Sequence, residues 1–290
     1  MEFKQITSRD LPLVAELLEL SNGNGAYGRG YPKGTLEGLT HEYAELGATL
    51  LEQFYLVGDN LGIFGIFDAP WGLYLIGPIF QPKHHSVDNM VAILEGIFQL
   101  PSLKCRKLAI TVLEENQVML EAVQKAGFSL TYEGVAMEYD LTGYPLKEIS
   151  AQMVEISTGD LDALEQINGI FKEDLEPWGN RTVEDLVEML EDETQIAALK
   201  QDGCVAGAII WSADPVLLES ELEYVCVKKE FQGQGYGKLL VDYAANALKL
   251  LGIKDWYLDT ARSNVRAQQF YLNHGFNIEY IRYVYEKQIL

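Results

Sequence analysis

The stretch that decides the fold is VCVKKEFQGQGYGK, residues 225–238. A β-branched strand runs into three alternate glycines, Gly233, Gly235 and Gly237, and a helical pattern begins directly after them. Glycine lets the backbone turn tightly and approach a ligand closely. The start of a helix offers unpaired N–H groups and the positive end of its dipole. The stretch therefore predicts a loop that binds a phosphate or pyrophosphate.

The spacing of this loop excludes two familiar nucleotide-binding motifs. A GxGxxG fingerprint would need a glycine where Lys238 stands. A GxxxxGK[ST] loop would need a glycine at Gln232 and a hydroxyl at Leu239. Three lysines, at positions 228, 229 and 238, add positive charge near the predicted anion-binding loop in a chain that is otherwise acidic.

Strand and helix patterns surround the loop throughout the second half of the chain. Period-2 and buried apolar runs predict strands at 153–157, 195–199, 205–211, 222–227, 256–260 and 280–285. Apolar spacing of three and four predicts four helices. The first is capped by Thr158 or Asp160, the second covers 183–190, the third follows the glycines to Leu250, and the fourth covers 265–273. Strands outnumber those of a strict alternation, so we predict an α/β fold in which helices flank a mixed sheet.

The chain also repeats itself at an offset close to half of its 290 residues. Residues 3–6, followed by Asp-Leu at 10–11, match residues 153–156, followed by Asp-Leu at 160–161. An Asn…Gly-Phe…Tyr series that starts at Asn116 recurs 148 residues later at Asn264. Such an offset indicates two copies of one domain. We expect a first copy over 1–143, a linker over 144–152 and a second copy over 153–290.

Two motifs in the second copy resemble those of the GNAT N-acetyltransferase superfamily. Gln232, Gly235 and Gly237 fit its acetyl-CoA loop, Q/R-x-x-G-x-G/A. Residues 264–276 read NVRAQQFYLNHGF and are similar to its second motif, N-x-x-A-x-x-F-Y-x-x-x-G-F. The resemblance implies two tandem GNAT-like domains, of which the second is catalytic.

The resemblance also implies acetyl-CoA as acyl donor, no metal, and a role for each matching residue. The backbone of 225–227 would receive the pantetheine arm, the loop would bind the pyrophosphate, and Asn264 would lie beside the arm. The residues assigned to the cofactor in this way are Val225, Cys226, Val227, Gln232, Gly233, Gln234, Gly235, Tyr236, Gly237, Lys238 and Asn264.

Two catalytic residues follow, an acid and a base. The resemblance places Tyr271 near the sulfur, where a phenol with an ordinary pKa of ~10 suits protonation of the departing thiolate. The alternative is a packed aromatic side chain on an amphipathic helix. Glu223 is the candidate base, because strand alternation puts Glu221, Glu223, Val225 and Val227 on one face. A surface glutamate is its alternative.

The first copy lacks the residues that carry this chemistry. At the offset of 148, HHSVDN (84–89) replaces QGQGYG (232–237), and Val123 replaces Tyr271. Asn116, Gly127 and Phe128 remain, and we expect them to serve helix capping and packing. Adjacent His84 and His85 cannot both face one ion on regular structure, so we expect no metal there. The first copy is predicted to be a scaffold.

Composition bounds the partners and the compartment. There are 22 basic and 43 acidic residues, a net charge of −21, and both halves are acidic. Nucleic acid is excluded as a partner because its binding needs clustered Lys and Arg. A membrane is excluded because no uncharged apolar run reaches ~18 residues. Cys105, Cys204 and Cys226 lie far apart, which favours a reducing, cytoplasmic setting.

We therefore predict an N-acetyltransferase that transfers acetyl to a primary amine of a small, cationic molecule. Thirteen acidic residues between 153 and 199, against only Lys172 and Arg181, would attract such an acceptor, although a solvated helical face explains them as well. The alternatives are a CoA-binding sensor or assembly module without turnover and a protein-lysine acetyltransferase. Monomer and homodimer both remain open.

Overall fold

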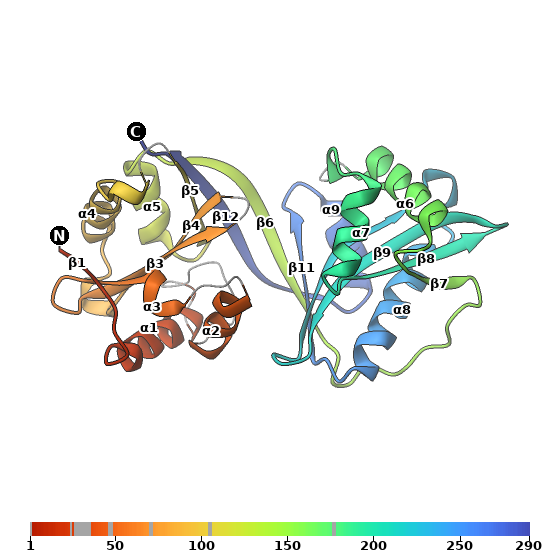
Figure 1. Ribbon diagram of the computed structural model, residues 1–290, viewed down its shortest axis with the longest axis horizontal. Coiled ribbons are helices and arrows are strands. Elements are labelled where there is room, and N and C mark those ends of the chain that lie inside the picture. Colours follow the sequence, from red (N-terminus) through yellow and green to blue (C-terminus); the bar gives the residue numbers. More distant parts are fainter. Residues whose placement is uncertain are drawn as a thin grey trace. The chain divides into compact units, whose positions relative to one another are not determined.

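The protein is described by a computed structural model (Figure 1). The described residues are 2–23, 25, 36–45, 49–69, 72–103, 106–175 and 178–290. Cys105 and Glu176 lie outside them. None of the helices in this described part is long and apolar enough to cross a membrane.

The elements of the first half come in the order expected of a mixed α/β fold. Its strands are β1 (Phe3–Gln5), β2 (Phe54–Val57), β3 (Gly62–Ala69), β4 (Gly72–Phe80), β5 (Lys107–Leu113) and β6 (Ser129–Asp140). Its helices are α1 (Leu11–Gly23), α2 (Leu36–Glu45), α3 (Leu50–Gln53), α4 (Val87–Ile97) and α5 (Gln117–Lys125).

The second half repeats this order. Its strands are β7 (Met153–Ile156), β8 (Gln195–Gln201), β9 (Cys204–Asp214), β10 (Glu219–Val227), β11 (Asp255–Ala261) and β12 (Asn277–Gln288). Its helices are α6 (Leu161–Asp174), α7 (Val183–Glu191), α8 (Tyr236–Leu250) and α9 (Val265–Asn273). The three elements β11, α9 and β12 begin and end 148 residues after β5, α5 and β6. The predicted fold class, a mixed sheet flanked by helices, is confirmed.

The compact units of the structure do not coincide with a simple cut after residue 143. Unit 1 consists of Met1–Val135, Ala261–Ser263 and Tyr280–Leu290, and unit 2 of Ala136–Thr260 and Asn264–Glu279. Both β6 and β12 therefore run through both units. In unit 1, β12 pairs antiparallel with β5, and in unit 2, β6 lies next to β11. The final strand of the second copy, β12, thus belongs largely to unit 1, whereas β6 is divided between the two units.

Unit 1 buries two apolar clusters, one on each face of its sheet. Side chains of α4 and α5, such as Met90, Ile93 and Val123, pack on one face. Side chains of α1, such as Val14 and Leu17, pack on the other.

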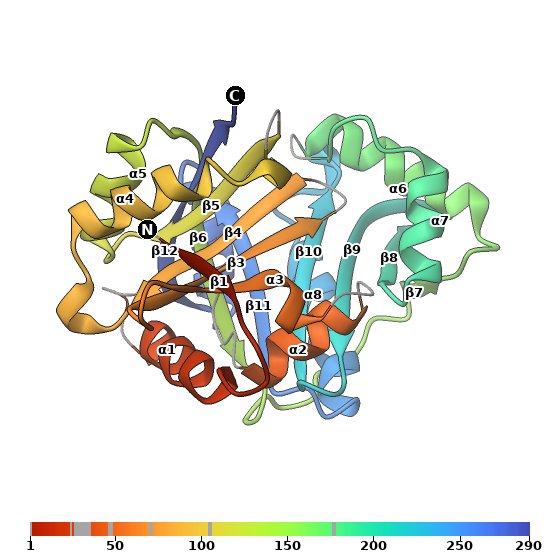
Figure 2. The same ribbon diagram turned by 60° about the vertical axis from the view of Figure 1, so that its left-hand side comes forward.

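Unit 2 orders its strands β6-β11-β10-β9-β8-β7. Helices α6 and α7 cover one face, where Ile210 of β9 joins their apolar cluster. The next residue along β9, Trp211, points to the opposite face and contacts Tyr243 of α8, with ring centroids 6.2 Å apart. Figures 1 and 2 show α6 and α7 together and α8 apart from them. The strand β10, which leads into the glycine loop, therefore has a helical layer on each side.

Candidate active site

The glycine loop joins the buried end of β10 to the first turn of α8, and Gln232 closes it. The Gln232 side chain donates from Nε2 to the Val227 carbonyl oxygen (2.8 Å) and accepts from Arg266 of α9 (2.9 Å). Gly237 begins the helix against the ring of Phe270, which a Cβ would approach to 3.0 Å. The loop is thus fixed to both β10 and α9.

Two glycines of the loop adopt a backbone that other residues rarely adopt. Gly233 has φ +77° and Gly235 φ +84°, and a Cβ at either position would meet no atom within 4 Å. Space is open beside both residues, so their requirement for glycine is one of backbone conformation.

The N-terminus of α8 is left without an internal hydrogen-bond partner. Gly235 is its N-cap and has no side chain to accept from the first turn. Within the described residues, the backbone N–H groups of 233–238 find no acceptor in the protein, and Leu239 is the first to donate, to the Gly235 carbonyl (3.2 Å). A row of free N–H groups at a helix start is an anion site.

The strands that lead to the loop separate from one another. The parallel pairing of β10 with β11 ends at Glu221↔Tyr257. On its other edge β10 stays paired with β9 as far as Val227↔Gly207. The backbone of Val225–Val227, which leads to the glycine loop, is therefore not paired with β11 on that edge.

Tyr271 lies on α9, near Cys226 of this unpaired stretch of β10. Asn264 caps α9 by accepting from the N–H of Ala267 (3.1 Å). The Tyr271 side chain is buried against Phe276, with ring centroids 5.6 Å apart. Burial, with a smaller contribution from the nearby Cys226 thiol, raises the pKa of Tyr271 above its usual range. The phenol therefore stays protonated at neutral pH.

Glu223 lies in a β-bulge of β10. The register with β9 shifts between Leu222 and Tyr224, so Glu223 is the extra residue. Burial, then the charge of Glu221, raises the pKa of Glu223 to about 7, against smaller opposing contributions from a hydrogen bond of Ser212 and from Arg181. A carboxyl with this pKa can exchange a proton at neutral pH.

Because of this bulge, the predicted alternation of side chains along β10 is wrong beyond Glu223. After Glu223 the side chains change faces, so Tyr224 and Cys226 join the apolar cluster beneath α6 and α7. Glu223 therefore shares its side of the sheet with Tyr224 and Cys226 rather than with Val225 and Val227. Simple alternation fails here because a bulge adds one residue to a strand without changing its composition.

An aromatic platform with a cation flanks Glu223, and the sequence did not reveal it. Trp178 is fully buried and packs edge-on against Tyr224, with ring centroids 4.9 Å apart. The Arg181 guanidinium lies over both rings, 5.2 and 5.4 Å from their centroids. Trp178 and Arg181 come from the segment between α6 and α7, whose mixed composition carries no periodic signal. They form the wall beside the candidate base.

Two of the three lysines near the loop already have acidic partners. Lys229 pairs with Asp174 at the end of α6 (2.8 Å), and Lys238 pairs with Asp242 one turn further along α8. The positive charge predicted for this region is therefore partly neutralised within unit 2.

The corresponding region of the first copy is closed. Ser86 caps α4 by accepting from the N–H of Asn89 (3.3 Å), and Asn89 donates to the His84 carbonyl (2.8 Å). Val123, at the position of Tyr271, is fully buried in the cluster where α4 and α5 pack directly on each other. Helices α8 and α9 make far fewer contacts with one another.

Asn116 and Phe128 of the first copy have the capping and packing roles predicted for them. Asn116 caps α5 by accepting from the N–H of Met119 (3.0 Å), as predicted. Phe128 lies in the core cluster. In the described part of the chain, no group of three or more His, Cys, Asp or Glu side chains could hold a metal ion.

Comparison with known proteins agrees with this geometry. Residues 163–276 match the profile of the Acetyltransferase (GNAT) family. A [ribosomal protein bS18]-alanine N-acetyltransferase from Haemophilus ducreyi is 37% identical over 78 residues, which are 27% of this chain and 52% of that protein. The chain thus spans about half the length of this curated relative.

Solved structures extend the likeness of fold to the whole chain. A GCN5-related N-acetyltransferase from Sphaerobacter thermophilus, 14% identical, has a TM-score of 0.69 over 99% of this chain and 95% of its own. A tandem GNAT protein from the clavulanic acid biosynthesis pathway, also 14% identical, has a TM-score of 0.61 over 100% and 98%. Residues 163–276 thus resemble the GNAT acetyltransferase family, and the fold of the whole chain is similar to that of a tandem GNAT protein.

Proposed function

We propose that the second copy transfers an acetyl group from acetyl-CoA to a primary amine. The observation that carries the proposal is the uncapped start of α8, with its row of free N–H groups, at the end of a strand that has separated from β11. The family match over 163–276 supports the same reading. The pyrophosphate would lie against Gln232–Lys238, and the pantetheine arm would lie along the unpaired edge of Val225–Val227.

The proposed reaction forms one amide bond and breaks one thioester bond. The neutral amine attacks the acetyl carbonyl, the tetrahedral intermediate expels the CoA thiolate, and the amine gives up one proton. Glu223, with a pKa of about 7, would accept the amine proton. Tyr271, which stays protonated, would give its proton to the thiolate. Proton transfer between the two sites through solvent resets the enzyme.

The acceptor is proposed to be a small molecule whose amine is recognised as a cation. Glu221 and Glu223 support this, because both carboxylates belong to the same stretch of β10 and interact electrostatically. If the acidic residues between 153 and 199 attract a cation, kcat/KM for the acceptor falls as ionic strength rises past ~0.1 M, where the Debye length is about 10 Å. Equal or better turnover of neutral and acidic amines would contradict the cationic acceptor.

The N-terminal amine of a protein is the second candidate acceptor, since the relative from Haemophilus ducreyi is named for a ribosomal protein alanine. A CoA-binding module without turnover is the third reading. The three are separated by one assay, in which thiol release from acetyl-CoA is scored over diamines, aminoglycosides, amino acids and an alanine-initiated peptide. Release with one class identifies it, and binding of CoA without any release supports the third reading. The separated cysteines support a cytoplasmic location, and we propose no particular oligomeric state.

A further inference from the structure

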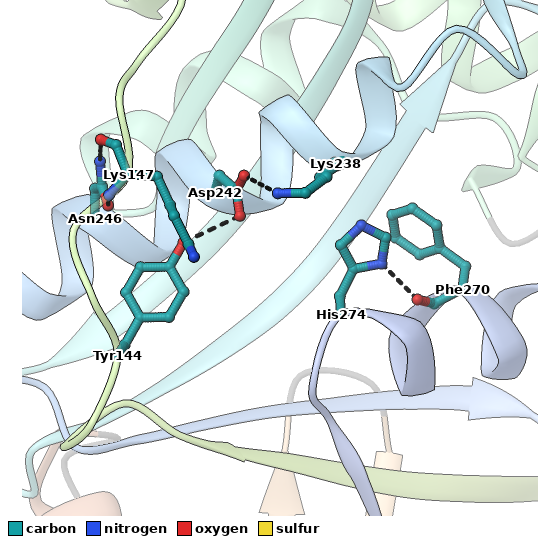
Figure 3. Close-up of polar contacts among 7 residues, drawn as sticks. All are labelled: Tyr144, Lys147, Lys238, Asp242, Asn246, Phe270 and His274. Carbon is teal, nitrogen blue, oxygen red and sulfur yellow. Dashed lines mark hydrogen bonds and ion pairs between the residues drawn. The ribbon is translucent and has the colours of Figure 1, made fainter.

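The segment between the two sequence copies packs tightly on α8 instead of hanging free. Tyr144 is buried, and its hydroxyl donates to Oδ1 of Asp242 (3.0 Å). The backbone of Lys147 exchanges two hydrogen bonds with the Asn246 side chain, of 3.0 and 2.8 Å. Figure 3 shows both attachments along one side of α8. The segment predicted as a linker is therefore part of the layer that carries the glycine loop.

Asp242 receives two partners, one on each carboxylate oxygen. Its Oδ1 accepts from Tyr144, and its Oδ2 pairs with the ammonium of Lys238. The Asp242 side chain is only 13% exposed, whereas that of Lys238 is 55% exposed. Burial and this carboxylate raise the pKa of Tyr144 above its usual range, so its hydroxyl remains a donor.

The position of Lys238 is unfavourable unless an anion is present. It stands in the first turn of α8, where the helix dipole disfavours a cation. A lysine placed four residues before its acidic partner also has the weaker of the two orientations of such a pair. The pair with Asp242 draws the ammonium along the helix, away from the free N–H groups of the glycine loop (Figure 3). A bound phosphate at that loop would compete with Asp242 for Lys238.

We infer that Asp242 and Tyr144 set the affinity of this enzyme for its phosphate-bearing cofactor by controlling where Lys238 points. The inference rests on the proposed function, because it assumes that CoA binds at the loop. Tyr144 and Asp242 are positioning residues that act through Lys238. Tyr144 shares the charge of Asp242 and so weakens its hold on Lys238.

The two positioning residues give opposite effects when they are altered. Asp242→Asn removes the carboxylate charge, frees Lys238 for the phosphates, and lowers the Kd for CoA by about two- to fivefold, the range of an exposed ion pair. Tyr144→Phe keeps the ring, leaves the carboxylate charge to Lys238 alone, and raises the Kd. Lys238→Met raises the Kd and abolishes the effect of both other substitutions.

The test is calorimetric binding of CoA and of pantetheine, which lacks the phosphates, to the full-length chain. Pantetheine affinity should stay within error for all three variants, because Lys238 has no phosphate to meet. The control is Lys249→Met, which removes another cation from α8. The Lys249 ammonium donates to the carbonyl oxygens of Leu141 and Thr142 (2.9 and 2.6 Å). CoA affinity of this control should stay unchanged.

Two results would overturn the inference. One is a Kd for CoA that rises in Asp242→Asn as it does in Tyr144→Phe, since both would then act by loosening the helix. The other is an equal change for pantetheine or for the Lys249→Met control. Failure of the unsubstituted protein to bind CoA at all would instead remove the proposed function.

Discussion

The first turns of α4 and α8 occupy equivalent places in the repeat, yet only the first turn of α4 is capped by a side chain. At α4 the hydroxyl of Ser86 caps the first turn, so the helix end is satisfied by its own chain. At α8 the cap is Gly235, which has no side chain, and the first N–H groups stay free. The replacement of QGQGYG (232–237) by HHSVDN (84–89) therefore separates an anion site from a structural helix end. Because α4 and α5 also pack on each other, the first copy has lost the space as well as the donors.

Replacing the open helix end is expected to have the largest effect. Gly235→Val places a β-branched residue at φ +84°, which costs about 1–3 kcal/mol and pushes the loop out of shape. We expect CoA affinity to fall about ten- to hundredfold in calorimetry. The matched control is Val87→Gly at the equivalent position of the first copy, which should leave CoA affinity unchanged. An unchanged CoA affinity in Gly235→Val would contradict the role of the loop.

The second comparison is between Tyr271 and Val123, the residue at the equivalent position of the first copy. Tyr271→Phe keeps the buried ring and removes only the hydroxyl, so CoA affinity should hold while kcat falls at least about tenfold. Steady-state kinetics with the best amine of the panel measures it. As a control, Tyr285→Phe alters a buried phenol of unit 1 and should leave kcat unchanged. An unaltered kcat in Tyr271→Phe would show that another group protonates the thiolate, provided that product release is not rate-limiting.

The raised pKa of Glu223 predicts a pH dependence of both rate and stability. The base is lost as the carboxyl takes up a proton, so kcat/KM should fall below about pH 7. Glu221→Gln should move this limb to lower pH, because the charge of Glu221 helps to raise the pKa. An acid limb of kcat/KM that stays the same in both Glu223→Gln and Glu221→Gln would exclude Glu223 as the base.

The sign of the stability effect follows from the same shift. The folded pKa of Glu223, about 7, lies above the ordinary value of 4.5. Its contribution to stability is therefore full below about pH 4.5 and is lost as the pH rises through 7. Glu223→Gln removes this loss, so the Tm of the variant should gain on that of the unsubstituted protein between pH 5 and pH 8. A Tm difference that does not change with pH would contradict the buried position of this carboxyl.

The smallest effect is expected at the first copy's helix cap. Ser86→Ala removes the acceptor for the Asn89 N–H and should lower the free energy of unfolding by about 1 kcal/mol. CoA affinity and kcat should not change. Denaturant unfolding, followed with and without CoA, checks both parts. A loss of CoA affinity in this variant would mean that the first copy does more than support the fold.

Much of this fold was readable from the sequence because its signals are local. The helix predicted at 265–273 has those bounds in α9, since an asparagine cap starts it and Gly275, at φ +98°, follows its end. The glycine loop was predictable from the spacing of Gln232, Gly235 and Gly237. The exchange of β6 and β12 left no signal, because a strand alternates in the same way whichever neighbour it pairs with.

The parts of the site that escaped the sequence depend on contacts far apart in the chain. The bulge at Glu223 contains no glycine or proline that would mark it. The pairs Lys229–Asp174 and Tyr144–Asp242 join residues 55 and 98 positions apart, and no pattern along the chain predicts such pairs. The burial that raises the pKa of Glu223 likewise follows from packing rather than from composition.

The central claim, one open copy and one closed copy, is tested most directly by the number of acetyl-CoA molecules that bind to each chain. Calorimetric titration of the full-length protein should give a stoichiometry of one, and Gly235→Val should weaken that binding about ten- to hundredfold. Two equivalent sites per chain, or one site whose affinity is unchanged in Gly235→Val, would contradict the account.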